Sequence, residues 1–129
     1  MEPYDNRGTP EAFARSVSAF HLLTAALSGQ EAGEWTHGEL EEHLQEAGRA
    51  LMRQLLQDHL DLRAMREEEH LVARPFVRVT GPDGILRPWR EKGHERWLST
   101  VFGHVRVRRI AHRGPGVSNV HPADVLLSL

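Results

Sequence analysis

The sequence predicts an α+β protein in which an amino-terminal helical hairpin with one long helix is followed by two β-hairpins forming a small antiparallel sheet. Three observations predict this class. Apolar residues recur every three or four positions up to about residue 70, and from there they alternate with polar residues. No proline interrupts the chain between Pro10 and Pro75. Glycine- and proline-containing turn sequences then divide the second part into short strands.

The first helix is expected to begin at Thr9-Pro10-Glu11 and to end near Ser28-Gly29. A threonine offers a capping hydroxyl, a proline lacks an N–H that the first turn does not need, and an acid suits the positive end of the helix dipole. Its apolar face follows from the helical spacing of five residues: Phe13, Val17, Phe20, Leu23 and Leu27.

The second helix is expected to begin with a capping box, in which Thr36 and Glu39 satisfy each other's exposed N–H groups. Without a proline it continues to about Glu69, roughly 50 Å at the usual rise per residue. A polar connector, residues 29–34, allows the two helices to pack antiparallel. The apolar stripe of the second helix consists of Leu40, Leu44, Ala47, Leu51, Leu55 and Leu62.

The second helix is several turns longer than the first, so part of its apolar stripe needs another partner. Either the carboxyl-terminal half of the chain covers it, or a second copy of the chain does. The second alternative predicts a homo-oligomer. Its candidate dimerisation residues are Leu40, Leu44, Leu51, Leu55 and Leu62.

The first β-hairpin is expected around the turn sequence Gly81-Pro82-Asp83-Gly84, which has a proline preset for its second position and a glycine free to take positive φ. Val77 and Val79 alternate with polar residues before this turn, and residues 85–89 form the return strand. Pro88 places that strand at a sheet edge.

The second β-hairpin is expected to pair residues 96–101 with residues 104–112 around a Phe102-Gly103 turn, after a polar bridge at residues 91–93. Phenylalanine is a poor residue for positive φ, so the register stays open, and a slip by one residue would exchange the two faces. Alternation places one polar and one apolar set on opposite faces. The polar face holds Trp97, Ser99, Val101, His104, Arg106 and Arg108, and the apolar face holds Leu98, Thr100, Val105, Val107 and Ala111.

Charge is divided unequally along the chain. Residues 1–70 carry 14 acidic residues against 6 arginines, whereas residues 71–129 carry 4 acidic residues against 10 basic ones. We therefore distinguish a helical hairpin with a dimerisation element, residues 1–70, from a basic β-hairpin region, residues 71–129, whose apolar tail stops abruptly at Leu129.

The basic β-ribbon is the best candidate binding surface, because arginines neutralise phosphates and a two-stranded ribbon fits the major groove of DNA. The alternative is a solvated outer face on which an arginine stem covers Trp97. The candidate DNA-binding residues are Trp97, His104, Arg106, Arg108, Arg109 and Arg113.

Catalysis by this chain alone is not expected. The sequence has no cysteine, no Gly-x-Ser-x-Gly elbow and no phosphate-binding loop, and its nine histidines lack metal-ligand spacing. The carboxylates of the basic half, at Asp83, Glu91, Glu95 and Asp124, are scattered. We expect no metal and no cofactor. The absence of cysteine and of any long apolar run predicts a cytoplasmic protein without a membrane span.

Several segments, taken in order, resemble the amino-terminal region of insertion-sequence transposases of the ISKra family. They are residues 44–63, Asp83-Gly84, Gly93-His94, residues 100–109 with the pattern Thr-x-Phe-Gly-x-Val-x-Val-x-Arg, and Pro115-Gly116 through Asp124. The resemblance covers roughly two thirds of the chain. The chain departs from the family pattern at His112, where tyrosine is frequent, and at Ser128, where asparagine is frequent.

The resemblance implies a full-length enzyme that cuts and joins DNA with an acidic triad and a divalent metal in a ribonuclease-H-like domain. That domain would lie beyond Leu129, so no triad residue can be assigned to this chain. The implied function is a non-catalytic part of a transposase that binds transposon-end DNA or assembles the enzyme. The alternative is a protein-interaction module or small regulator that assembles through the long helix without binding DNA.

Overall fold

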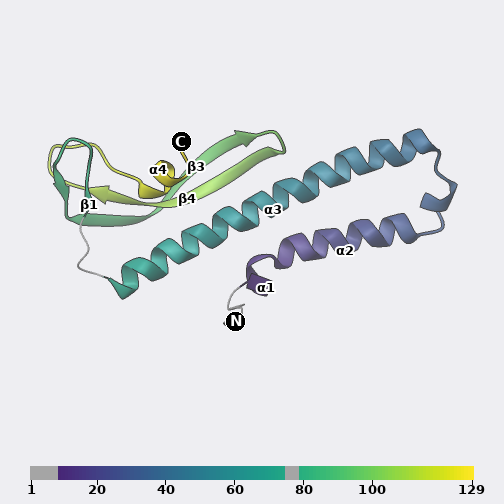
Figure 1. Ribbon diagram of the computed structural model, residues 1–129, viewed down its shortest axis with the longest axis horizontal. Coiled ribbons are helices and arrows are strands. Elements are labelled where there is room, and N and C mark those ends of the chain that lie inside the picture. Colours follow the sequence, from purple (N-terminus) through teal and green to yellow (C-terminus); the bar gives the residue numbers. More distant parts are fainter. Residues whose placement is uncertain (1–8, 75–78) are drawn as a thin grey trace, which may run out of the picture. The chain divides into compact units, whose positions relative to one another are not determined.

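The α+β class is confirmed. The computed structural model describes residues 9–74 and 79–129, so the predicted strand residues Val77 and Arg78 lie outside the described part. The helices and strands follow one another in the predicted order (Figure 1). They are α1 (Thr9–Ala12), α2 (Ala14–Ser28), the 3-10 helix η1 (Ala32–Glu34), α3 (His37–Ala73), β1 (Val79–Thr80), β2 (Leu86–Arg87), β3 (Trp89–Thr100), β4 (Gly103–Arg113) and α4 (Pro122–Leu126).

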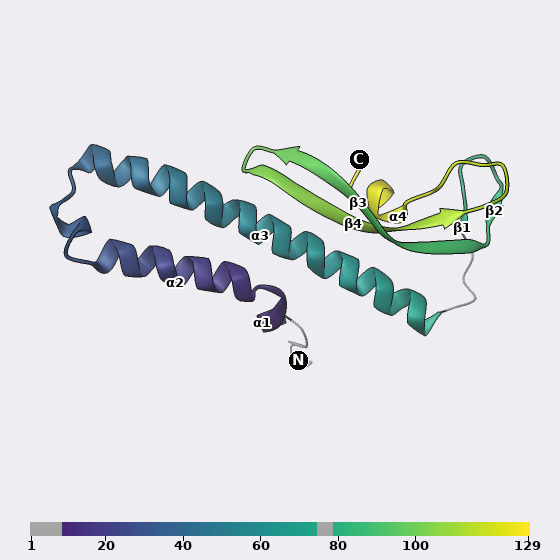
Figure 2. The same ribbon diagram turned by 180° about the vertical axis from the view of Figure 1, so that it is seen from behind.

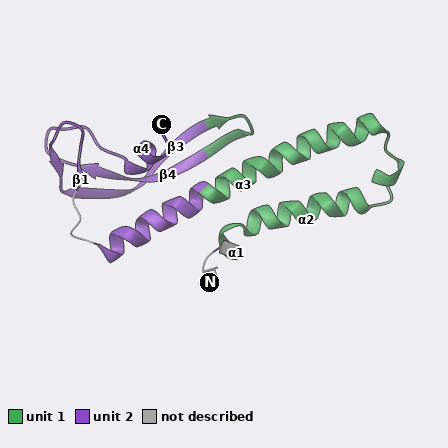
Figure 3. Cartoon of the chain, viewed as in Figure 1, with its two compact units in different colours: residues 1–59, 99–105 green, residues 60–98, 106–129 purple. Residues whose placement is uncertain are grey.

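The described strands form two separate two-stranded sheets, β1–β2 and β3–β4. The chain divides into two compact units that do not coincide with the helical and β parts of the sequence (Figure 3). Unit 1 comprises residues 1–59 and 99–105, and unit 2 comprises residues 60–98 and 106–129. Helix α3 and the β3–β4 hairpin therefore contribute residues to both units.

In unit 1, helix α2 runs antiparallel beside the first part of α3 (Figures 1 and 2). The predicted capping box is confirmed: the Thr36 N–H donates to the Glu39 carboxylate and the Glu39 N–H donates to the Thr36 hydroxyl, both at 3.2 Å. Helix α2 ends at Ser28 as predicted. The single first helix is interrupted at Phe13, whose φ of -105° and ψ of 17° separate α1 from α2.

Asp58 of α3 joins the two helices of unit 1. One of its carboxylate oxygens accepts hydrogen bonds from the Ser16 N–H at 3.0 Å and from the Ser16 hydroxyl at 2.6 Å. The other oxygen accepts one from Gln54 Nε2 at 2.8 Å. Ser16 is the third residue of α2, so a carboxylate from α3 caps the amino-terminal turn of α2 and meets the positive end of its dipole.

Unit 1 buries few side chains completely, and two of these are polar. The α2–α3 pair brings only one narrow seam together, which leaves flanks of both apolar stripes in solvent, and residues 99–105 of the hairpin complete the unit. Its buried residues are Ser16, Ala32, Asp58 and Val105.

Unit 2 has an apolar core at the carboxyl-terminal part of α3 and on β4, with Leu60, Leu62, Val107, Ile110 and Ala111 buried. Glu67 of α3 ties the helix to the strand by accepting a hydrogen bond from the Ile110 N–H at 3.0 Å. Burial raises the pKa of Glu67 above that of an ordinary glutamate, partly opposed by this hydrogen bond.

The carboxyl-terminal segment folds onto the β3–β4 hairpin within unit 2. His112 and Val120 form an antiparallel bridge with N–H to O distances of 2.8 and 2.9 Å. Helix α4 then begins at Pro122, where the sequence indicated only an apolar stretch after a loop. Asp124 of α4 is ion-paired with Arg109 of β4.

The β3–β4 turn differs from the predicted Phe102-Gly103 turn, because the two residues between the strands are Val101 and Phe102. Gly103 takes the positive φ, at 120°, which suits glycine and not phenylalanine. The Thr100 hydroxyl stabilises the turn by accepting from the Phe102 N–H at 3.1 Å and donating to the Gly103 carbonyl at 2.7 Å.

The alternation of β4 keeps its predicted faces, whereas Val101, predicted on the polar face, lies in the turn. Val105 and Val107 are accordingly buried while Arg106 and Arg108 are exposed. Alternation ends beyond Arg109, since residues 110–112 are all buried. The expected polar bridge at residues 91–93 lies inside β3, and of the predicted return strand 85–89 only Leu86–Arg87 forms β2.

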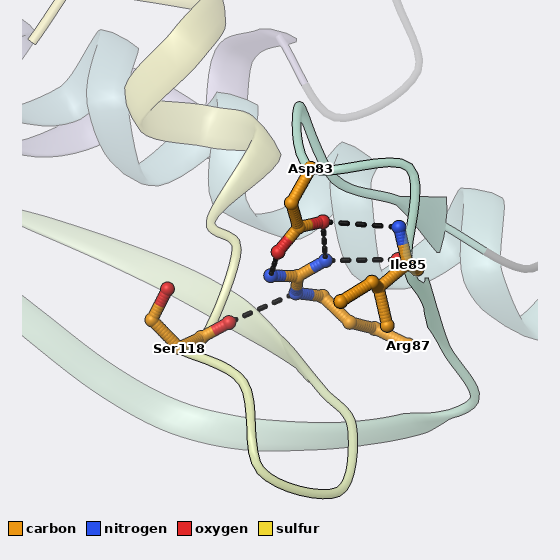
Figure 4. A network of polar contacts seen from close by, with 4 residues as sticks. All are labelled: Asp83, Ile85, Arg87 and Ser118. Carbon is orange, nitrogen blue, oxygen red and sulfur yellow. Dashed lines mark hydrogen bonds and ion pairs between the residues drawn. The ribbon is translucent and has the colours of Figure 1, made fainter.

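The predicted Gly81–Gly84 turn joins β1 to β2, which pair antiparallel with Val79 opposite Arg87. Arg87 is buried and binds both carboxylate oxygens of Asp83, the Ile85 carbonyl and the Ser118 carbonyl, each at 2.8 Å (Figure 4). A Cβ atom on Gly81 would collide with the Arg87 guanidinium. The arginine therefore fixes both the turn and the segment that leads to α4.

Candidate nucleic-acid interface and apolar face

Trp97 and Arg106 form an exposed aromatic and cationic pair in unit 2. Trp97 lies on β3 with 67% of its surface exposed, and the Arg106 guanidinium carbon on β4 lies 5.5 Å from the centre of its ring. This distance is within the range of a cation–π contact. An exposed ring backed by a guanidinium is a surface on which a nucleic-acid base could stack.

Arg106 and Arg108 point from alternate positions of β4 to the solvent-exposed face, with side chains 51% and 53% exposed. Arg106 pairs with Glu95, and Arg108 pairs with Asp61, both at 3.6 Å. Exposed pairs of this kind contribute about 0–1 kcal/mol, so a phosphate could replace either carboxylate at little cost.

Arg109 and Arg113 both form ion pairs within unit 2, but the Arg113 side chain is 53% exposed. The Arg109 side chain is only 16% exposed and is ion-paired with Asp124, which also lies 3.4 Å from Arg96. Arg113 is ion-paired with Glu91, and hydrogen bonds from His94 and Arg113 lower the pKa of that carboxyl. Arg109 is thus placed where it stabilises α4 rather than where a phosphate could reach it.

His104 lies in unit 1, where its Nδ1 atom is 3.1 Å from the Ser99 hydroxyl. It is exposed and is the second residue of β4, next to the β3–β4 turn. The other candidate DNA-binding residues all belong to unit 2.

The candidate dimerisation residues do not share one environment. Leu40 and Leu51 are half-buried in unit 1, and Leu44 and Leu55 are exposed there. Leu62 is buried inside unit 2, so we leave it out of any proposed interface.

Five exposed apolar residues of unit 1 lie on one side of the helix pair, whereas Leu22 is exposed on the other side of α2. Ser16 and Asp58 face each other, and positions can be counted from them at about 100° per residue. We count this angle about each helix axis in the direction of increasing residue number. Because the two helices are antiparallel, residues with the same angle lie on the same side of the helix pair. The residues between about 40° and 120° in that sense form a surface that we name the apolar face. It consists of Val17 and Phe20 of α2 and Leu44, Met52 and Leu55 of α3, which are between 42% and 52% exposed.

Some structural residues were missed by sequence reasoning. Asp58 occupies a position of the apolar stripe, three residues after Leu55 and four before Leu62, and that spacing was a signal for a buried acid. The ion pair of Arg87 with Asp83 had no comparable signal, because strand alternation does not reveal which arginine folds back into its own turn.

The described residues contain no group of three or more histidine and carboxylate side chains that could hold a metal ion. Within the same residues, no helix combines the length and apolarity that crossing a bilayer requires. No family model, curated protein or solved structure matches the chain.

Proposed function

We propose that this chain is an assembly module, in which the apolar face of unit 1 pairs with the same face of a second copy to form a four-helix arrangement. One observation carries the proposal: five large apolar side chains on one side of a two-helix unit stay about half exposed. Large exposed apolar patches are rare on monomeric proteins and commonly mark an interaction site.

The free energy gained by burying the apolar face and the free energy that association costs are of similar size. Burying the exposed half of one large apolar side chain contributes about 1 kcal/mol, and a symmetric pair would bury ten of them for about 10 kcal/mol. Association itself costs about 4–15 kcal/mol. We therefore expect a dimer whose population depends on protein concentration.

Sedimentation equilibrium over a concentration series tests this proposal. We expect the wild-type chain to dimerise and the double variant Phe20→Glu with Leu55→Glu to stay monomeric. Circular dichroism should show that the variant keeps the helix content of the wild type. Leu22→Glu is the matched control, because Leu22 is strongly exposed on the other side of α2. A monomeric wild type, or a control that dissociates as readily as the double variant, would refute the proposal.

A second candidate function is binding of a nucleic-acid backbone by Trp97, Arg106 and Arg108. The exposed ring, the stacked guanidinium and the weak surface ion pairs favour it. Arg109 is excluded from this surface by its burial against Asp124.

The salt dependence of duplex DNA binding tests the second function. Replacing Arg106 and Arg108 by alanine should lower the slope of log K against log salt by about two units. Replacing Arg15 and Arg49 of unit 1 by alanine removes the same charge elsewhere and should leave the slope unchanged. Equal slopes in the wild type and the Arg106/Arg108 variant would exclude these two arginines from binding.

Together, the two surfaces agree with the transposase resemblance. A transposase must assemble on DNA ends, and a non-catalytic part of one would need self-association, DNA contact or both. Assembly without DNA binding would instead favour a protein-interaction module or a small regulator. Light scattering with and without duplex DNA separates these outcomes, because only the transposase part forms a larger complex when DNA is added.

A further inference from the structure

Unit 2 contains a cavity of about 650 Å³ between the carboxyl-terminal part of α3, strand β4 and helix α4. This volume lies within the range of about 300–1,000 Å³ that is typical of small-molecule sites. Most of its wall is aliphatic. The apolar lining residues include Leu60, Ala64, Leu71, Val107, Ala123 and Leu126.

Besides the arginines, three titratable side chains line the cavity: His112, Glu67 and the exposed His70. His112 is buried, and its backbone is fixed by the bridge to Val120. Among the residues that the structure describes, none offers a hydrogen-bond partner to its buried Nδ1 atom. Burial lowers the pKa of His112, so its imidazole is neutral at pH 7. Glu67 keeps one oxygen on the Ile110 N–H and lies in the same wall.

The rim of the cavity is positively charged. Arg63, Arg66 and Arg108 line it from α3 and β4 together with Glu67, and Arg108 is paired with Asp61. Arg66 is exposed, and Arg108 is held only by a surface ion pair. A guanidinium at the rim of an aliphatic cavity suits a ligand that has an anionic head and an apolar body.

We propose that this cavity binds an amphipathic carboxylate of medium chain length, with its apolar body between α3, β4 and α4 and its carboxylate at the arginine rim. The site is independent of the apolar face of unit 1. No bond is made or broken on binding.

Isothermal titration calorimetry with decanoate, and with decanol as its uncharged counterpart, tests the site. We expect saturable binding of one decanoate per chain, at least tenfold tighter than decanol. Arg66→Gln should weaken decanoate binding several-fold and leave decanol binding unchanged. Equal affinity for the two probes in the wild type would overturn the carboxylate assignment.

Filling the cavity tests its location. Ala64→Phe should reduce decanoate binding at least tenfold, and Ala123→Phe on α4 should do the same if the first variant does not fold. Ala26→Phe on α2 is the matched control and should bind normally. Decanoate should also shift the imidazole resonances of His112. Absence of saturable binding, or normal binding by both filled variants, would overturn the site.

The apolar face of unit 1 is the other surface that could take up decanoate. Phe20→Glu with Leu55→Glu should therefore retain decanoate binding. Loss of binding in that variant would move the ligand to unit 1 and refute the proposal.

Discussion

Unit 1 and unit 2 share one continuous helix, yet different interactions stabilise them. Unit 1 is joined by a polar junction at Ser16 and Asp58 and leaves its larger apolar side chains about half exposed. Unit 2 buries aliphatic residues from α3 and β4 and adds internal ion pairs at Arg87 and Arg109. The comparison teaches that continuity of a helix does not imply a common core. Unit 2 has a buried apolar core like that of a small folded domain, whereas the larger apolar side chains of unit 1 are only about half covered.

The largest expected effect comes from the apolar core. Ile110→Ala in unit 2 should lower the free energy of unfolding by about 2–5 kcal/mol, because it leaves a cavity among buried neighbours. Leu55→Ala in unit 1 removes a side chain already 42% exposed and should cost the monomer less than about 1 kcal/mol. Urea unfolding at low protein concentration measures both. Equal losses would mean that the two units have cores of the same kind.

The next effect separates two neighbouring arginines. Arg109→Met should destabilise the protein by about 2–3 kcal/mol, because it leaves the nearly buried Asp124 without its main ion-pair partner. Arg108→Met, on the exposed face, should cost about 0–1 kcal/mol. Thermal unfolding of the two variants checks the difference. A similar melting temperature for both would place Arg109 on the surface after all.

The polar junction of unit 1 should have a slightly smaller effect. Asp58→Ala removes the acceptor of three hydrogen bonds and should cost about 1.5–3 kcal/mol. Hydrogen exchange should then speed up in α2 before it does so in β4. Uniform acceleration across both units would show that they unfold together.

The last effect depends on pH and concerns the Asp83–Arg87 ion pair. Hydrogen bonds from Arg87 hold the pKa of Asp83 well below its usual value near 3.8. A lowered folded-state pKa contributes stability that is present above the unfolded-state pKa and is lost as pH falls towards the folded-state pKa. Asp83→Asn should therefore flatten the fall of stability below about pH 4. Parallel acid-unfolding curves for variant and wild type would contradict this.

The sequence predicted what depends on periodicity. Helical spacing gave both helices of unit 1, and the Thr36 and Glu39 pattern gave the first turn of α3. The two faces of β4 followed from alternation, even though the turn began one residue early. These features depend on neighbours a few positions away, which a single sequence displays.

What the sequence did not predict depends on distant partners. Ser16 meets Asp58 across 42 positions, and Arg87 reaches the Ser118 carbonyl across 31. The candidate site was affected in the same way: alternation brought Trp97 and Arg106 to one face, but it gave no sign that Arg109 would turn inward to Asp124. Such pairings follow from the packed fold and have no local signature.

The close fit of Gly81 against the Arg87 guanidinium has a consequence for how this protein can evolve. Any side chain at position 81 collides with a group that is itself bound on several sides, so the two positions are constrained jointly. In a saturation mutagenesis library, position 81 should accept nothing larger than glycine while Arg87 is present. A shorter residue at 87 should restore tolerance there, so the two sites should behave as an epistatic pair. Gly33, Gly38 and Gly48, where an added Cβ meets no atom within 4 Å, should tolerate alanine freely.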